Sequence, residues 1–326
     1  MKCQISLSSC CVRFLLPILF VALLSACGGS HKLSDPENPY RVQADNHIHN
    51  GLAAMQYERW QSAERSFERA LTSAQLADDL RLVGQCWYNL AIVRTAQKNT
   101  EGAMEAYLRV IELSELRHDT NMHMRAQLAL ALLQQQEARL PDSFKLQQLP
   151  GSLFQAGNWP ADIHLQAARL AQLQQQNPLA QQAYQAVTVR KGSDRNLLKM
   201  KAEAHMGLAL LARADNSDEE AWSEAEQVLE QCRKIGAPRL TAHALLLQGQ
   251  LPVADNSERR QRLQRALDIY AALADGAGQR QALAALIKVS LPGQSPGLQL
   301  RLQQLEDKLG KETEEAESLP HTDEVH

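Results

Sequence analysis

The sequence contains few residues that break helices and few aromatic side chains. Among its 326 residues are 16 glycines and 12 prolines, and aromatic residues make up only 5%. Sandwiches and barrels of short strands need many turns, and therefore more glycine and proline. Apolar residues nevertheless make up 44% of the chain, which is enough for a substantial core. The composition therefore excludes a disordered chain and favours a helical protein.

The chain also lacks a strong charge of either sign. Its 34 Lys and Arg residues against 37 Asp and Glu residues give a formal net charge of −3. Residues 1–26 carry Lys2 and Arg13 and no acidic residue, so the remainder has a net charge of −5. Proteins that hold a phosphate backbone normally present a basic surface. We therefore expect no nucleic-acid partner.

Cysteine is scarce beyond the first 27 residues. The chain has six cysteines, of which only Cys86 and Cys232 follow that point. They lie far apart in sequence, and no Cys-x-x-Cys pair occurs. We expect two single buried thiols rather than a disulfide or a metal site.

No apolar run reaches the about 20 residues that a membrane-spanning helix needs. The longest, Phe14–Leu24, follows the basic residues Lys2 and Arg13 and precedes Leu24-Ser25-Ala26-Cys27. This arrangement resembles the signal peptide and lipobox of bacterial lipoproteins. Small residues before the cysteine admit the signal peptidase, and the Cys27 thiol accepts a diacylglycerol. An ordinary secretory signal with a chance cysteine is the alternative.

The lipoprotein resemblance implies an address for the mature chain. Residues 1–26 are removed, Cys27 carries palmitate-type acyl chains, and two or three such chains anchor a protein stably. Gly28-Gly29-Ser30 follows the cysteine, without the aspartate that signals retention in the inner membrane. The resemblance therefore implies an outer-membrane protein that faces the periplasm.

Two segments of the chain align at an offset of 40 residues. The matched positions are Gly51 with Ala91, Ala63 with Ala103, and Phe67 with Tyr107. Trp87-Tyr88-Asn89-Leu90 opens the second segment. Together these features resemble the tetratricopeptide repeat (TPR), a helix–turn–helix unit of a stacked solenoid. The small residues let two helices approach closely, and the aromatic residue fills the gap to the next pair.

The pattern predicts an all-α, TPR-like solenoid of stacked antiparallel helix pairs in two blocks. Between the blocks, residues 139–160 contain several prolines and glycines. Leu298, Leu302, Leu305 and Leu309 predict a terminal helix that covers the end of the stack. The predicted segments are a signal peptide (1–26), a lipidated cysteine and flexible tether (27–43), an N-terminal TPR block (44–138), an irregular joint (139–160), a C-terminal TPR-like block (161–309) and an acidic disordered tail (310–326).

We find no constellation that indicates catalysis. The chain contains no HExxH, GxSxG, Walker-type or strand-associated GxGxxG motif. The His47/His49 and His118/His123 spacings place the two rings of each pair on different faces of a helix, which is poor geometry for a shared metal. Trp159, Asp162 and His164 lie close in sequence, but no triad logic links them. We therefore expect neither an enzyme nor a cofactor, metal or small-molecule substrate.

Recognition of protein partners is the function that the resemblance implies. In TPR proteins the first helix of each pair lines the concave groove. The matching positions here are Ile48, Leu52, Met55, Gln85, Tyr88, Asn89, Ile92 and Thr95. Tyr88 offers apolar area with a polar tip, and Gln85 and Asn89 offer hydrogen bonds to a peptide backbone. For Leu52 and Ile92, packing against neighbouring helices is an equally good interpretation.

The leading hypothesis is a lipid-anchored adaptor or scaffold for periplasmic or envelope proteins, for example in pilus biogenesis. Tethering itself raises the effective concentration for partners at the envelope. The alternative is a peptide- or glycan-binding module that regulates peptidoglycan enzymes. The tryptophans at Trp60, Trp87 and Trp222 occupy core-like repeat positions, which disfavours sugar stacking.

The lipobox makes a direct prediction about Cys27. In Cys27→Ser the oxygen replaces the acylated sulfur, so we expect loss of palmitate labelling and accumulation of unprocessed or released chain. Metabolic labelling followed by membrane fractionation measures both effects. Labelling that survives this substitution contradicts the assignment.

Overall fold

The computed structural model describes residues 38–137, 149–157, 159–290 and 295–318. The predicted signal peptide, Cys27 and most of the predicted tether lie outside these residues, as do residues 319–326. Within the described ranges every regular element is a helix and there is no strand. The elements are α2 (Pro39–Gln56), α3 (Trp60–Leu76), α4 (Leu80–Ala96), α5 (Thr100–Leu116), α6 (Thr120–Gln136), the 3₁₀-helix η3 (Gly151–Phe154), α7 (Ala161–Leu173), α8 (Asn177–Thr188), α9 (Arg195–Ala214), α10 (Asp218–Ile235), α11 (Pro238–Gln250), α12 (Asn256–Ala272), α13 (Gly276–Val289) and α14 (Ser295–Ser318).

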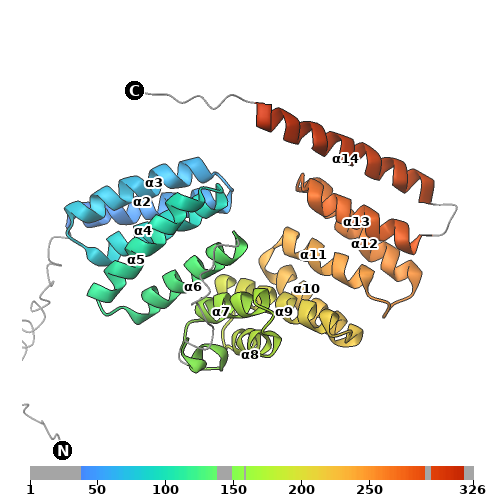
Figure 1. Ribbon diagram of the computed structural model, residues 1–326, viewed down its shortest axis with the longest axis horizontal. Coiled ribbons are helices and arrows are strands. Elements are labelled where there is room, and N and C mark those ends of the chain that lie inside the picture. The colour runs from blue at the N-terminus through green and yellow to red at the C-terminus, as the bar shows by residue number, and fades with distance from the viewer. Residues whose placement is uncertain (1–37, 138–148, 158, 291–294, 319–326) are drawn as a thin grey trace, which may run out of the picture.

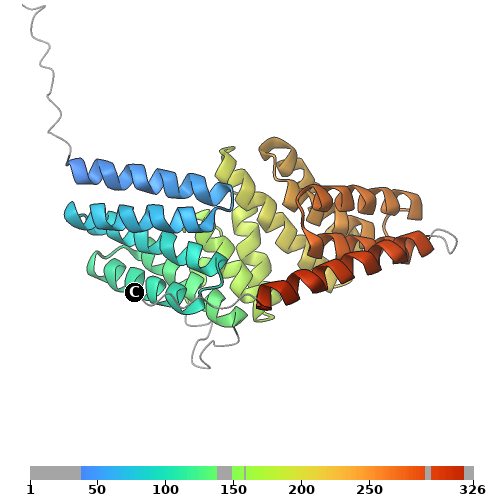
Figure 2. The ribbon, with the colours of Figure 1, turned by 90° about the horizontal axis from the view of Figure 1, so that it is seen from above.

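Consecutive helices pack against one another along the whole described chain, and the stack bends into an open curve (Figure 1). Turned by 90°, the N-terminal helices lie side by side in one direction, while the helices at the centre of the stack cross them at an angle (Figure 2). The first helices of successive pairs also touch, α2 with α4, α7 with α9, α9 with α11 and α11 with α13. Neighbours on the inside of a curved stack lie closest together, so the first helices form the inner face. The predicted TPR-like solenoid of helix pairs is confirmed.

A 20-residue unit underlies the 40-residue repeat. Helices α3 to α6 begin at residues 60, 80, 100 and 120, and each has 17 residues. A connection of three residues therefore joins each to the next. Asp79, Asn99 and Asp119 cap the following helices by accepting hydrogen bonds from helical N–H groups.

Each of the helices α2 to α5 is closed by a residue in the left-handed conformation. Glu58, Asp78, Lys98 and His118 have φ between 50° and 62°. The amide of the next residue then donates to a carbonyl five residues back, as Asp79 N does to Ala74 O at 3.1 Å. This is the Schellman motif, which normally uses glycine because a Cβ strains the left-handed conformation. The sequence does not reveal these helix ends, because none of the four residues is the glycine that normally marks a Schellman motif.

Glycines face aromatic rings where helices touch most closely. A Cβ added to Gly51 on α2 would lie 2.5 Å from Cε1 of Phe67 on α3. Gly207 meets the ring of Tyr184 in the same way, at 2.2 Å, and Gly278 meets that of Tyr270, also at 2.2 Å. All three rings are buried. In the first repeat the ring fills the space that the small residue of its own helix pair leaves, whereas the prediction placed it in the gap to the next pair.

The described part of the predicted joint is packed against the stack. η3 contacts α7 and α8, and its Leu153 and Phe154 are buried. Arg190, after α8, donates to the carbonyl oxygens of Gly157 and Trp159. Residues 138–148 of the joint lie outside the described residues. The joint therefore contributes to the core that spans α6 to α9.

Two predicted boundaries are wrong. α2 begins at Pro39, inside the predicted tether, because proline suits the first helical position and the Asn38 side chain accepts from the Tyr40 amide. α14 continues to Ser318, beyond the predicted limit of residue 309, because glutamate and lysine favour helix. The packing of Leu298, Leu302 and Leu305 against the last core cluster confirms the covering helix. Leu309 has no described side chain.

The curve brings the first helix pair into contact with α11, in the C-terminal half of the stack. Glu58, in the connection between α2 and α3, accepts a hydrogen bond from Arg239 of α11 at 3.2 Å across 181 residues of sequence. Arg239 also lies 3.8 Å from Asp275, the N-cap of α13. Arg239 thus joins the connection between α2 and α3 to the start of α13.

The glycine contacts predict opposite effects for two substitutions. We expect Gly207→Ala to destabilise the fold by about 1–3 kcal/mol, because its methyl group would overlap the Tyr184 ring. Gly84→Ala, also within a helix but with nothing within 4 Å of the new Cβ, is expected to stabilise by up to about 1 kcal/mol. Urea unfolding measures both.

A second-site control tests the cause. In a Tyr184→Leu background the cost of Gly207→Ala is expected to shrink, because the ring that it meets is gone. Equal costs in the two backgrounds would show that the ring is not what the glycine accommodates.

Candidate interaction groove

The predicted groove residues of α2 do not share one environment. Ile48 is 3% exposed and belongs to the core of the first helices, so it offers no surface to a partner. Met55 is partly buried against the same core. Leu52 is 40% exposed and is the one of the three that remains available. On this helix the packing interpretation therefore holds for Ile48.

The predicted groove residues of α4 are mostly half-buried. Gln85, Ile92 and Thr95 each retain some exposure. The Thr95 hydroxyl donates to the Ala91 carbonyl at 2.8 Å and interacts with the side chain of Tyr107. Thr95 is thus already engaged within its own helix pair, whereas the partly exposed Gln85 makes no side-chain hydrogen bond within the part of the chain that the structure describes.

Tyr88 connects the N-terminal helices to the C-terminal ones. Its ring packs edge-on against Tyr107 of α5, with centroids 6.0 Å apart. Its hydroxyl accepts a hydrogen bond of 3.1 Å from Nε2 of Gln166 on α7. Burial raises the pKa of Tyr88 above its usual value, so the phenol stays neutral. Tyr88 is therefore held in place across the junction of the two predicted blocks.

An ion pair supports this junction. Arg125 of α6 and Asp162 of α7 form two parallel hydrogen bonds, one of which, from Nη2 to Oδ1, measures 3.1 Å. Both side chains are partly buried. The paired geometry fixes α6 against α7 and so sets the position of Gln166, one turn further along α7.

Two buried polar atoms beside Tyr88 have no hydrogen-bond partner. One is Nδ2 of Asn89, a residue only 7% exposed; the other is Oε1 of Gln166. The first is a donor and the second an acceptor. A buried polar atom without a partner costs about 1–3 kcal/mol. Both atoms belong to residues next to Tyr88, Asn89 in sequence and Gln166 through its hydrogen bond to the hydroxyl, and each lacks the bond that would offset its burial.

A ladder of polar contacts links the helices of successive pairs. Each rung joins a basic side chain to an acidic or amide group 34 to 38 residues later. The rungs are Arg41 with Asp79, Arg125 with Asp162, Arg169 with Glu203, Arg213 with Gln250, and Arg239 with Asp275. Exposed pairs stabilise little. Their effect here is to give the inner face a mixed, nearly neutral polarity.

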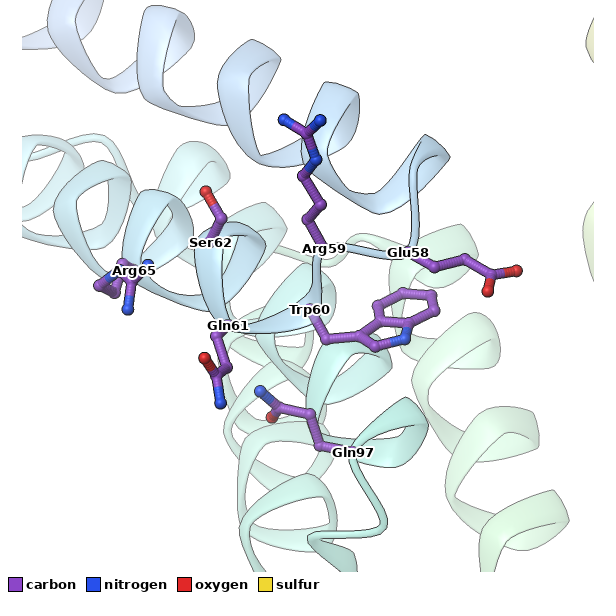
Figure 3. Close-up of a pocket in the computed structure, with 7 residues that line it drawn as sticks. All are labelled: Glu58, Arg59, Trp60, Gln61, Ser62, Arg65 and Gln97. Atoms are coloured by element: carbon purple, nitrogen blue, oxygen red, sulfur yellow. The ribbon is translucent and has the colours of Figure 1, made fainter. Parts of the chain in front are cut away.

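A shallow depression lies beside Trp60, at the start of α3. Its volume is about 700 Å³, and its lining combines the partly exposed indole with the side chains of Glu58, Arg59, Gln61, Ser62, Arg65 and Gln97. Figure 3 shows the indole between Glu58 and Gln97. The same ring packs against the core of the first helices. An aromatic face among amide and charged groups suits a sugar as well as a peptide.

The remaining predictions concern the thiols and the anchor. Cys86 and Cys232 are buried and unbonded, as expected, and burial raises the pKa of Cys86 to about 12. Cys27 lies outside the described residues. Among the helices of the described ranges, none combines the length and apolarity that crossing a bilayer requires.

No protein-family model matches the chain, and none of the curated proteins is significantly similar to it in sequence. The TPR and lipoprotein resemblances therefore rest on the residues named above.

Tyr88 and Asn89 are among the groove residues predicted from the sequence, whereas Arg125 and Gln166, which the structure places near Tyr88, are not. Both lie on helices of the inner face, at positions that the 40-residue alignment did not cover. Their proximity to Tyr88 depends on how sharply the stack bends at α6 and α7, which no local pattern encodes.

Acid lability follows from the position of His164 on α7. Its ring is fully buried, and its Nδ1–H donates to the Leu153 carbonyl at 2.7 Å. Burial lowers its pKa below the usual value of about 6.5. The unfolded chain then binds a proton that the folded chain resists, so stability is full above about pH 6.5 and falls as the pH drops below it.

We expect His164→Gln to reduce the stability lost between about pH 7.5 and 5.5 by about 1 kcal/mol, measured by urea unfolding at both values. His49→Gln, at an exposed position on α2, serves as the control and should leave the loss unchanged. An unaltered pH dependence in His164→Gln would mean that another group titrates.

Proposed function

We propose that this chain is an outer-membrane-anchored periplasmic lipoprotein whose solenoid is a protein–protein interaction adaptor, a scaffold in assembly of the cell envelope. The proposal combines the lipobox at Cys27 with the inner face of the helix stack. Acylation confines the solenoid to a thin layer above the membrane, and the inner face supplies the recognition. Pilus biogenesis is one process in which such a scaffold would serve.

The unpaired donor and acceptor beside Tyr88 carry the recognition half of the proposal. A peptide group presents one C=O and one N–H, the complements of Nδ2 of Asn89 and Oε1 of Gln166. Satisfying both atoms relieves the free chain of an existing cost, so the gain goes to the complex. Tyr88, held by Gln166, places an aromatic side chain next to these atoms. This combination favours an extended polypeptide segment as the ligand.

The second candidate is a peptide- or glycan-binding module that regulates peptidoglycan enzymes. The observation that favours it is the depression beside Trp60, with its indole and amide side chains. Loss of glycan-fragment binding in Trp60→Ala, measured by calorimetry, would support this module. Protein binding at Tyr88 does not require Trp60, so the two functions separate.

The adaptor predicts a substitution that weakens binding without weakening the fold. Asn89→Leu removes the unpaired donor at similar volume, so stability is expected to stay equal or rise. Partner binding is expected to fall about tenfold or more, because the replaced hydrogen bond is buried. A photo-reactive residue at Gln85 in the lipidated chain, cross-linked in cells, reports the yield of each partner.

The matched control is Gln182→Leu, an amide on the exposed face of α8. It should leave the cross-linked partners and their yield unchanged. Equal yields in Asn89→Leu and in the control would place recognition elsewhere on the solenoid.

A further inference from the structure

The two ends of the N-terminal helices differ in a regular way. The final residues of α2 to α6 are Gln56, Leu76, Ala96, Leu116 and Gln136. These positions are equivalent, because α3 to α6 repeat every 20 residues. Among these five final residues, leucine occurs only at the ends of α3 and α5. Both ends lie on the side of the stack where α2, α4 and α6 begin, on the left in Figures 1 and 2. We call this side, defined by Tyr40, Leu76, Leu80 and Leu116, the leucine edge.

The apolar side chains of the leucine edge are turned to solvent. Leu116 is 73% exposed, Leu76 60%, Leu80 45% and Tyr40 42%. None of the four belongs to a core cluster or packs against one. Single exposed leucines are common on protein surfaces. Leu76 and Leu116, however, occupy equivalent helix ends 40 residues apart, and packing of the helices does not require them. The opposite edge exposes a single large apolar side chain of the described connections there, Tyr57 after α2, at 72%.

Most of the charged side chains at this edge lie close to a side chain of opposite charge. Asp79 caps α4 and pairs with Arg41, and it lies 4.0 Å from Arg81. Asp119 caps α6 and lies 3.7 Å from Arg117. Asp78 and Glu115 add two exposed acids. The edge is thus close to neutral, so what it offers an occupant is apolar contact rather than a charge of one sign.

The polypeptide enters the fold at the leucine edge. Pro39 begins α2 there, and only the eleven residues 28–38 separate it from Cys27. Eleven residues extend at most about 40 Å. The opposite edge lies one helix length, about 27 Å for 18 residues, further from the anchor. If Cys27 is acylated, the leucine edge is therefore the edge of the N-terminal helices at which the chain arrives from the bilayer.

We propose that the leucine edge rests on the lipid surface in which Cys27 is anchored. Leu76 and Leu116 enter the headgroup region, and Leu80 and Tyr40 flank them, as apolar and tyrosine side chains do at membrane interfaces. The N-terminal helices α2 to α5 then stand roughly along the membrane normal, with their opposite edge turned away from the lipid. The inference rests on the lipid anchor of the proposed function.

The test measures the depth of single positions in the full lipidated chain. A polarity-sensitive fluorophore is attached to Leu116→Cys, and to Ala96→Cys as the matched position of the opposite edge. Cys86 and Cys232 are buried and do not compete for the label under native conditions. The chain is reconstituted in vesicles of phosphatidylethanolamine with a minor share of phosphatidylglycerol, with nitroxide-bearing lipids as quenchers.

We expect quenching at position 116 to exceed that at position 96 by a factor of about three or more. Leu76→Cys against Gln56→Cys repeats the comparison, so a folding defect in one variant does not decide the result. Equal, weak quenching at both edges of an anchored chain overturns the inference. So does a response at position 116 that requires added periplasmic protein, because the edge is then a protein-docking surface.

Mass spectrometry of the same preparation distinguishes a failure of the lipid anchor from a failure of the membrane contact of the leucine edge. A chain without lipid on Cys27 refutes the anchor, and with it the reason for placing the leucine edge on the membrane. A lipidated chain with unquenched labels refutes the leucine edge alone.

Discussion

The fold depends on the close approach of helices at positions that lack a large side chain. Gly51 admits the ring of Phe67, and Gly207 and Gly278 admit those of Tyr184 and Tyr270. Each ring spans the layer between two helices, so a chain with few aromatic residues still fills its core. Because every contact of this kind joins only neighbouring helices, the bend of the whole stack is the sum of many local separations.

Much of this architecture follows from local sequence. The spacing of Gly51, Ala63 and Phe67 predicts a helix pair, and the pair is present because the same three positions pack it. The lengths of the connections did not follow, since the left-handed residues that close the helices are Lys98 and His118 rather than glycine. The start of α2 at Pro39 is not evident from the sequence, because proline is as typical of a tether as of the first helical turn.

The candidate site could be predicted only on one side. Tyr88 and Asn89 follow from the repeat pattern, whereas Gln166 and Arg125 reach them through the bend at α6 and α7. The chain between α6 and α7 is irregular where the structure describes it, and η3 packs there with Leu153 and Phe154 buried beside α7. An irregular connection has no period, so the angle at which α7 meets α6 cannot be inferred from the repeat.

The first helix pair meets α11 through Glu58 and Arg239, two side chains that are 60% and 51% exposed. An ion pair this open to water contributes at most about 1 kcal/mol and weakens as salt is added. The distance between the first helix pair and α11 is therefore governed by the elasticity of the intervening helices rather than by this ion pair. A ligand that contacts both must deform those helices to fit, and the energy of that deformation is part of its binding free energy.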